Sequence, residues 1–280
     1  MNKYKITLEY DGTGYHGWQT QKNAKSVQET LIKAATQLTG TGVDVQGAGR
    51  TDAGVHALAQ VAHLETKKKL EPRKIMEGLN DLLPSGINII RVERTAPRFH
   101  ARHHAQSRSY VYLISKRRTA FGKRYVWWIE DRLDCRAMAE AGQLFQGFHD
   151  FASFADKRSG KEISTLVQID LVEVFETDGL IVFRIAGSHF LWKMVRRIVG
   201  VLVEVGRGTL SSQDVEGMLY NPSDIPAQVT AFPSGLFLEQ VLYEGDTLQS
   251  AGSLPTLPVP GLWKHDARIE RKPETARGVK

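Results

Sequence analysis

The chain has 280 residues, of which 41% are hydrophobic and 24% charged, and its formal net charge is +6 at pH 7. This composition is typical of a soluble globular protein with one large domain or two smaller ones, and no apolar run approaches the roughly 18 residues that cross a bilayer. The single cysteine, Cys135, excludes an intrachain disulfide and a zinc site built from several thiolates. Because the N-terminus also lacks an apolar signal segment, we expect a cytoplasmic protein.

Hydrophobic patterning predicts a compact α+β unit in the first half. Ser26 with Glu29 three residues later forms a capping box, and the helix it opens ends at Gly40. Apolar residues alternate along residues 3–10, which predicts a half-buried strand. Further along the chain, the same rules predict a strand from residue 43 into a glycine-rich loop, a strand at 57–65, a helix at 72–83 and a strand at 87–93.

The second half mixes strands and helices in the same way. The first predicted elements are strands at 108–115 and 125–129 and a helix capped by Asp134. They are followed by strands at 168–176 and 180–186, joined by a hairpin turn at Asp178-Gly179. A helix at 190–205, which we expect to end at Gly206, and a strand at 236–243 complete the half. This order favours an α+β fold over a doubly wound parallel sheet. We expect halves at 1–105 and 106–245, followed by a flexible basic tail at 246–280.

The most informative segment is Gly-Ala-Gly-Arg-Thr-Asp-Ala-Gly-Val-His at residues 47–56. Its glycines let the backbone approach a ligand closely, and Arg50 and His56 flank the carboxylate of Asp52. An arginine near a carboxylate can also contact phosphate. The segment therefore indicates an acidic catalytic group delivered on a turn to an anionic substrate, the alternative being a loop in which Asp52 caps its own backbone.

Basic and aromatic residues are interleaved between Arg91 and Arg124. This stretch holds ten Lys or Arg residues and one acid, Glu93, together with Tyr110 and other aromatic side chains. Such a mixture suits RNA, because phosphates meet the cations and bases stack on the rings. The alternative is a pair of solvated loop faces.

Several segments in one order resemble the TruA-type tRNA pseudouridine synthases. They are Gly-Arg-Thr-Asp-Ala-Gly-Val-His at 49–56, the opening segment 9–19, Ser26-Val27-Gln28, Phe99-His100-Ala101-Arg102, Tyr110-Val111-Tyr112, the segment Lys193 to Gly200, and Gly235-Leu236-Phe237-Leu238. Ordered motifs from residue 4 to about 243 carry far more weight than any one of them. The resemblance implies an isomerase, an intramolecular transferase that converts uridine to pseudouridine in the anticodon stem-loop at nucleotides 38, 39 and 40.

The resemblance also assigns residue roles. It implies that Asp52 is the catalytic carboxylate, attacking C1′ or C6 of the uridine or assisting glycal formation. It places Arg50 near the flipped nucleotide, the alternative being an ion pair with Asp52 or Glu65. It places Tyr110 against the target uracil, although a strand tyrosine is more often plain core.

Two later residues complete the implied site. The resemblance places Arg196 in an ion pair that compensates the charge of Asp52. Helical spacing leaves Arg197 open as the partner, and a solvated basic helix face as the alternative. Leu236 matches a leucine at the floor of the uridine pocket and is explained equally well as core.

The resemblance further implies two similar, RRM-like α/β-sandwich halves joined edge to edge around a basic cleft, and a homodimer that grips tRNA. Because the isomerisation neither oxidises nor adds anything, no cofactor is expected. We expect no metal either, since His56 and His63 lack ligand spacing and no acid lies in register with them. Two other functions stay as alternatives. The first is an RNA-binding module without catalytic activity, although the carboxylate of Asp52 would repel phosphates and weaken such binding. The second is a hydrolase acting on a nucleoside or glycoside, although the motifs offer no clear second carboxylate to act with Asp52.

Overall fold

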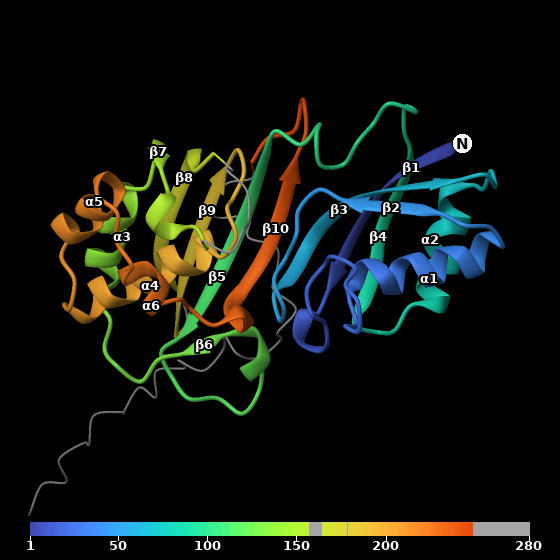
Figure 1. Ribbon diagram of the computed structural model, residues 1–280. Helices are drawn as coiled ribbons and strands as arrows, with labels where there is room; N and C mark the ends of the chain where they lie inside the picture. The colour runs from blue at the N-terminus through green and yellow to red at the C-terminus, as the bar shows by residue number, and fades with distance from the viewer. Residues whose placement is uncertain (157–163, 178, 249–280) are drawn as a thin grey trace, which may run out of the picture.

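The computed structural model describes residues 1–156, 164–177 and 179–248, and it has a mixed α+β architecture built on one large sheet (Figure 1). The strands of this described part are β1 (Asn2–Tyr10), β2 (Asp44–Gly47), β3 (His56–Thr66), β4 (Ile87–Arg94), β5 (Ser107–Ser115), β6 (Trp127–Trp128), β7 (Gly147–Asp150), β8 (Leu166–Thr177), β9 (Leu180–Gly187) and β10 (Leu236–Leu242). The helices are α1 (Val27–Thr39), α2 (Pro72–Leu82), α3 (Cys135–Gln143), α4 (Met194–Arg207), α5 (Ser212–Tyr220) and α6 (Ile225–Gln228). The α+β prediction is confirmed.

Local signals in the sequence account for the first helix. The Ser26 hydroxyl accepts a hydrogen bond from the Glu29 N–H at 3.2 Å, which caps α1 at its start. Gly40 ends α1 in the left-handed conformation, with φ of 68°. The two ends of α1 therefore lie where the sequence predicts them.

The last strand of the described chain lies in the middle of the sheet. The strand order is β4-β1-β3-β10-β5-β9-β8-β7, with β2 paired to β3 and β6 to β5. β10 runs antiparallel to β5 and parallel to β3, which it meets through the pairs Phe237–His56 and Leu238–Ala57. Helices α1 and α2 lie beside the β1–β3–β4 part of the sheet, and α3 to α6 beside the β5–β9 part (Figure 1). β10 therefore joins two parts of the fold that are far apart in the sequence.

The helix that carries Arg196 begins later than its apolar pattern predicts. α4 begins at Met194, because Lys193 adopts the left-handed conformation with φ of 63° and forms the N-cap. The prediction that Gly206 stops this helix is wrong. Gly206 lies inside α4, where a Cβ atom would come within 2.8 Å of the Met138 sulfur, and Gly208 forms the C-cap.

Other differences concern short elements. The strand predicted at 125–129 shrinks to the two residues of β6, while β7, α5 and α6 have no counterpart in the sequence prediction. Asp178 and the predicted tail from residue 249 onward lie outside the described residues. Within the described residues, the structure contains no helix of the length and apolar character needed to cross a bilayer.

Candidate active site

Asp52 lies on the loop between β2 and β3, and the N-terminal segment of the chain holds this loop in place. The Trp18 N–H donates to the Thr51 carbonyl at 3.1 Å, and the Gly54 N–H donates to the Tyr15 carbonyl at 3.2 Å. Gly54 has a φ of 76°, which favours glycine. The backbone on both sides of Asp52 is therefore fixed by hydrogen bonds.

Buried side chains support the same loop from below. The Tyr10 hydroxyl and the Thr51 hydroxyl are 2.8 Å apart, and the amide of the fully buried Gln60 donates to the Gly49 carbonyl at 3.0 Å. Gly17, with φ of 88°, passes so close that a Cβ atom there would lie 2.4 Å from the Thr51 carbonyl oxygen. The loop is thus packed against rigid neighbours and presents Asp52 in one orientation.

Arg196 is the cation that the fold brings to Asp52. Its Nη1 lies 3.3 Å from Oδ2 of Asp52, and its Nε donates to the Ala231 carbonyl at 2.7 Å. The Ala231 N–H in turn donates to the Arg196 carbonyl at 3.0 Å. Both side chains of the pair are largely shielded from solvent, with 14% and 22% exposed. The guanidinium therefore has a fixed position against the carboxylate.

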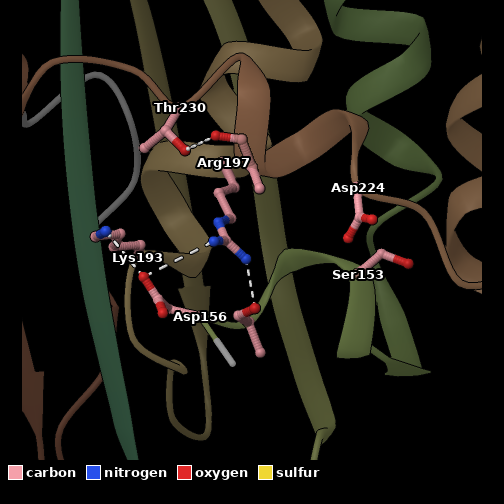
Figure 2. A pocket seen from close by; sticks show the side chains of 8 residues that line it. Ser153, Asp156, Lys193, Arg197, Asp224 and Thr230 are labelled. Carbon is pink, nitrogen blue, oxygen red and sulfur yellow. Dashed lines mark hydrogen bonds and ion pairs between the residues drawn. The ribbon is translucent and has the colours of Figure 1, made fainter. Parts of the chain in front are cut away.

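The neighbouring Arg197 points away from Asp52. Its Nη1 donates to the Ala155 carbonyl and its Nη2 lies 3.9 Å from the buried carboxylate of Asp156 (Figure 2). Lys193 reaches the same carboxylate at 2.8 Å. These side chains line a cavity of about 320 Å³. Asp156 therefore anchors the start of α4, and the adjacent Arg196 faces Asp52.

Tyr110 lies on β5, close to the Asp52 loop. It is 8% exposed, and a Cβ atom on Gly49 would lie 3.8 Å from its hydroxyl. The rings of Tyr110 and Phe190 meet edge to face, with their centres 5.1 Å apart. Burial raises the pKa of the Tyr110 hydroxyl to about 12, so at neutral pH this group is protonated.

Leu236 is buried at the start of β10. It is 5% exposed and pairs with Tyr112 of β5. The Tyr112 hydroxyl donates to the Phe232 carbonyl at 2.7 Å, so the chain entering β10 is held just before Leu236. Leu236 is therefore part of the core at the point where this strand joins the sheet.

Arg50 is exposed, and the acids that could have paired with it have other partners. Asp52 contacts Arg196, and Glu65 lies 2.5 Å from the Lys3 ammonium. A cavity of about 300 Å³ opens beside Arg50, and it is lined by Trp18, Gln19, Gln28, Asp44, Gln46, Gly47, Gly49, His100 and Arg102. The Arg50 guanidinium is thus accessible to an anionic ligand, and the basic side chains of His100 and Arg102 line the same cavity.

His56 links the two parts of the fold immediately after the Asp52 loop. Its Nδ1 lies 3.0 Å from the N–H of Gly12, which can only donate, so Nδ1 accepts. The proton is then on Nε2, which donates to the Arg124 carbonyl at 3.0 Å. The ring also stacks on Phe237 of β10, with centres 4.8 Å apart. Burial lowers the pKa of His56, in agreement with a neutral ring.

Sequence reasoning missed the acid beside His56. The Asp11 carboxylate lies 3.3 Å from Nδ1 and accepts a hydrogen bond from the Tyr125 hydroxyl at 2.9 Å. The sequence prediction that no acid lies in register with His56 did not indicate this contact. His56 follows Asp11 by 45 positions (56 minus 11), and Tyr125 follows it by 114, separations that no local spacing indicates.

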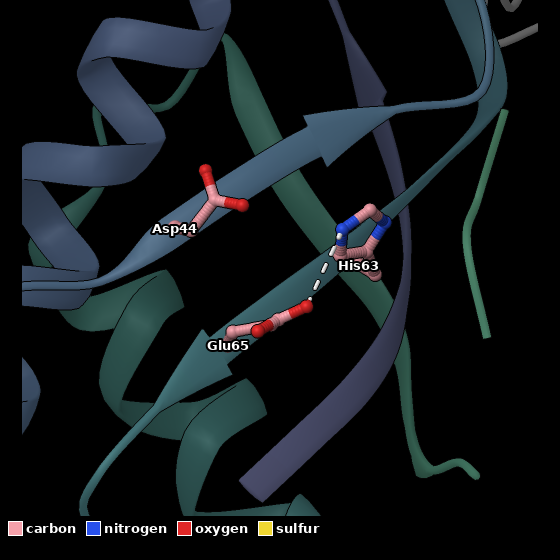
Figure 3. Close-up of side chains that lie close together, drawn as sticks. All are labelled: Asp44, His63 and Glu65. Atoms are coloured by element: carbon pink, nitrogen blue, oxygen red, sulfur yellow. Dashed lines mark ion pairs between the residues drawn. The ribbon is translucent and has the colours of Figure 1, made fainter. Parts of the chain in front are cut away.

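Acids also lie close to His63. Asp44, His63 and Glu65 offer ligand atoms within 4.8 Å of one another (Figure 3). However, Nδ1 of His63 accepts the N–H of Ala101 at 3.1 Å, so Nε2 carries the proton and faces Glu65 at 3.9 Å. A protonated nitrogen cannot bind a metal, and the Lys3 ammonium already occupies Glu65. The cluster is therefore arranged as a hydrogen-bonded and ion-paired group.

Comparisons with known proteins show the family of this chain. A family model described as tRNA pseudouridine synthase matches residues 6–104 and 141–244. The tRNA pseudouridine synthase A of Ruminiclostridium cellulolyticum is 40% identical over 246 residues, covering 87% of this chain and 100% of that protein. That of Acetivibrio thermocellus is 40% identical over 245 residues, with the same coverage. The tRNA pseudouridine synthase A 2 of Bacillus cereus is 36% identical, covering 86% and 99%. The chain therefore belongs to the tRNA pseudouridine synthase family.

Proposed function

We propose that this protein isomerises uridine to pseudouridine in the anticodon stem-loop of tRNA, at nucleotides 38, 39 and 40. The observation that carries the proposal is the ion pair of Asp52 and Arg196, 3.3 Å long, at the junction of the two parts of the sheet. A carboxylate is the group that this chemistry requires. The family membership and the names of the relatives support the same reaction.

The reaction breaks the C1′–N1 bond of uridine, rotates the uracil and forms a C1′–C5 bond. The hydrogen on C5 leaves to solvent and N1 gains a proton, so the product is an isomer and no cofactor takes part. Asp52 acts on the uridine by attacking C1′ or C6 or by assisting glycal formation. Because the target base is stacked within RNA, it must first be flipped out of the helix.

The other side chains then have defined tasks in this proposal. Arg196 compensates the charge of Asp52, and exposed Arg50 contacts the RNA where the nucleotide leaves the stack. Tyr110 stacks on the uracil, with a hydroxyl that burial keeps protonated. Leu236 forms the floor of the uridine pocket.

The proposed architecture extends the observed sheet. Residues 1–105 and 106–245 form two similar, RRM-like halves, joined through β3 and β10, and two copies of the chain form a homodimer around tRNA in the cytoplasm. The parallel pairing of β3 with β10, through Phe237 and His56, supports an edge-to-edge junction.

Tritium release from tRNA carrying [5-³H]uridine tests the proposed function. The wild-type protein should release tritium, and a folded Asp52→Ala variant that still binds tRNA should release none. If the folded wild type releases no tritium from any tRNA, the enzyme proposal is wrong and a silent RNA-binding module takes its place.

A further inference from the structure

An exposed aromatic residue directly follows Ala231, the residue whose carbonyl holds Arg196. Phe232 is 61% exposed, and it lies on the short segment between α6 and β10. The preceding residue, Ala231, accepts the hydrogen bond from Arg196 Nε at 2.7 Å. The following residue, Pro233, packs on the Asp52 loop, since a Cβ atom on Gly54 would lie 3.2 Å from its Cγ. Phe232 is therefore placed between the two elements that form the ion pair.

The backbone of this segment is held from several sides. Ala231 both accepts from and donates to Arg196, and the Phe232 carbonyl accepts the Tyr112 hydroxyl at 2.7 Å. The Ser234 hydroxyl donates to the Val126 carbonyl at 3.3 Å. An exposed side chain on such a restrained backbone keeps its place relative to Asp52.

The ring of Phe232 also has a defined orientation. It meets the Trp127 ring edge to face, with the two ring centres 5.7 Å apart and the planes at 72°. Trp127 is supported in turn by Tyr112, at 6.3 Å and 82°. The contact fixes one side of the Phe232 ring and leaves the rest to solvent. A preoriented, exposed aromatic surface next to an RNA-modifying site is suited to stacking.

We propose that Phe232 is a stacking platform for the nucleobase next to the reacting uridine in the RNA strand. The inference rests on the proposed function, because it takes RNA as the substrate. When the uridine leaves the helix, its neighbour loses a stacking partner, and an aromatic side chain can replace that partner. Such stacking accepts any base, since every base has a π-face.

Phe148 provides a matched control, because single exposed aromatic residues are common on protein surfaces. It is 63% exposed, close to the value for Phe232, and it lies on β7 at the edge of the sheet. β5, β9 and β8 separate β7 from β10. Its substitution therefore removes a similar exposed ring far from the Asp52 loop.

The test uses anticodon stem-loop RNAs that carry 2-aminopurine, a base whose fluorescence falls on stacking, immediately 5′ or 3′ of the target uridine. We expect the fluorescence of one of these two probes to fall when the wild-type protein binds. The fall should be equally large with Phe232→Tyr and with Phe148→Ala. Phe232→Ala and Phe232→Leu should lose that quenching and bind the RNA about tenfold more weakly.

The proposal is overturned if Phe232→Ala matches Phe148→Ala in quenching and affinity, or if Phe232→Leu matches wild type, because an apolar contact would then suffice. Circular dichroism checks that each variant folds. If Phe232→Ala does not fold, the test is the comparison of Phe232→Leu, which should lose the quenching, with Phe232→Tyr, which should keep it. Tritium release is measured on the same wild-type protein. Its absence would reject the isomerase, whereas quenching reports on Phe232 without turnover.

Discussion

Arg196 and Asp52 are 144 positions apart in the sequence, yet Nη1 of the one lies 3.3 Å from Oδ2 of the other. The carboxylate belongs to the loop between β2 and β3, and the guanidinium belongs to α4 in the other part of the fold. The charge of Asp52 is therefore compensated only when both parts are assembled. The candidate site forms where the two parts meet, and neither part contains it alone.

Replacing Arg196 by lysine should impair turnover far more than replacing Arg197. A lysine ammonium cannot serve both Asp52 and the Ala231 carbonyl as the planar guanidinium does. We expect Arg196→Lys to lower kcat by about a hundredfold, which is the usual cost of losing one fixed electrostatic group.

Arg197→Lys is the matched control one residue away. Its guanidinium contacts Ala155 and Asp156, so the change should lower the free energy of unfolding by roughly 1–3 kcal/mol and leave kcat within a fewfold of wild type. Single-turnover rates at saturating tRNA and urea unfolding measure the two effects. A loss of kcat in folded Arg197→Lys but not in Arg196→Lys would reverse the assignment of partners.

Gly17 and Gly14, which lie between β1 and α1, should differ sharply in how well they tolerate substitution by alanine. In Gly17→Ala, the new Cβ would lie 2.4 Å from the Thr51 carbonyl, on a backbone with φ of 88°. The Asp52 loop must then shift, so activity should fall by at least about a hundredfold. Gly14→Ala meets no atom within 4 Å and should retain wild-type activity. Equal activity of the two variants would show that the Thr51 contact does not position Asp52.

The stability of the protein should fall on acidification, partly through His56. Burial lowers the pKa of this ring below its ordinary value of 6.5, so the unfolded chain binds the proton more readily than the folded one. The free energy of unfolding should therefore decrease as the pH falls through 6.5 and level off below the folded pKa.

His63, His100 and His189 also have lowered pKa values and contribute in the same direction. Urea unfolding between pH 8 and 5 on His56→Gln isolates the contribution of His56, because glutamine does not titrate. The variant should lose less stability than wild type over this interval. An identical pH dependence in both proteins would mean that His56 is as easily protonated in the fold as in the unfolded chain.

Local chemistry made much of the fold predictable. Ser26 and Gly40 mark the ends of α1 because capping depends only on neighbouring residues. The start of α4 was not predictable in this way, because the apolar pattern continues upstream while Lys193 turns the backbone out of the helix. Gly206 was predicted to end the helix, but it lies inside α4, where the absence of a Cβ atom lets Met138 pack closely against the backbone.

The residues of the candidate site also differ in how far local sequence could predict them. A single glycine-rich segment indicated Asp52, because its chemistry is local. Helical spacing could not choose between Arg196 and Arg197, since the choice depends on how α4 packs against Ala231 and Asp156. The contacts of His56 join segments from three places in the chain, and only the folded molecule displays them.

The placement of β10 also bears on how the chain is synthesised. Until residues 236–242 have left the ribosome, His56 and Ala57 of β3 and residues 107–112 of β5 lack the strand that pairs with them in the sheet. Exposed strand edges invite pairing with other chains. The nascent protein thus depends on β10, the last strand of the described residues, to cover these edges and to join the parts that carry Asp52 and Arg196. A chain truncated before β10 is exposed to misassembly and lacks the junction at which the candidate site forms.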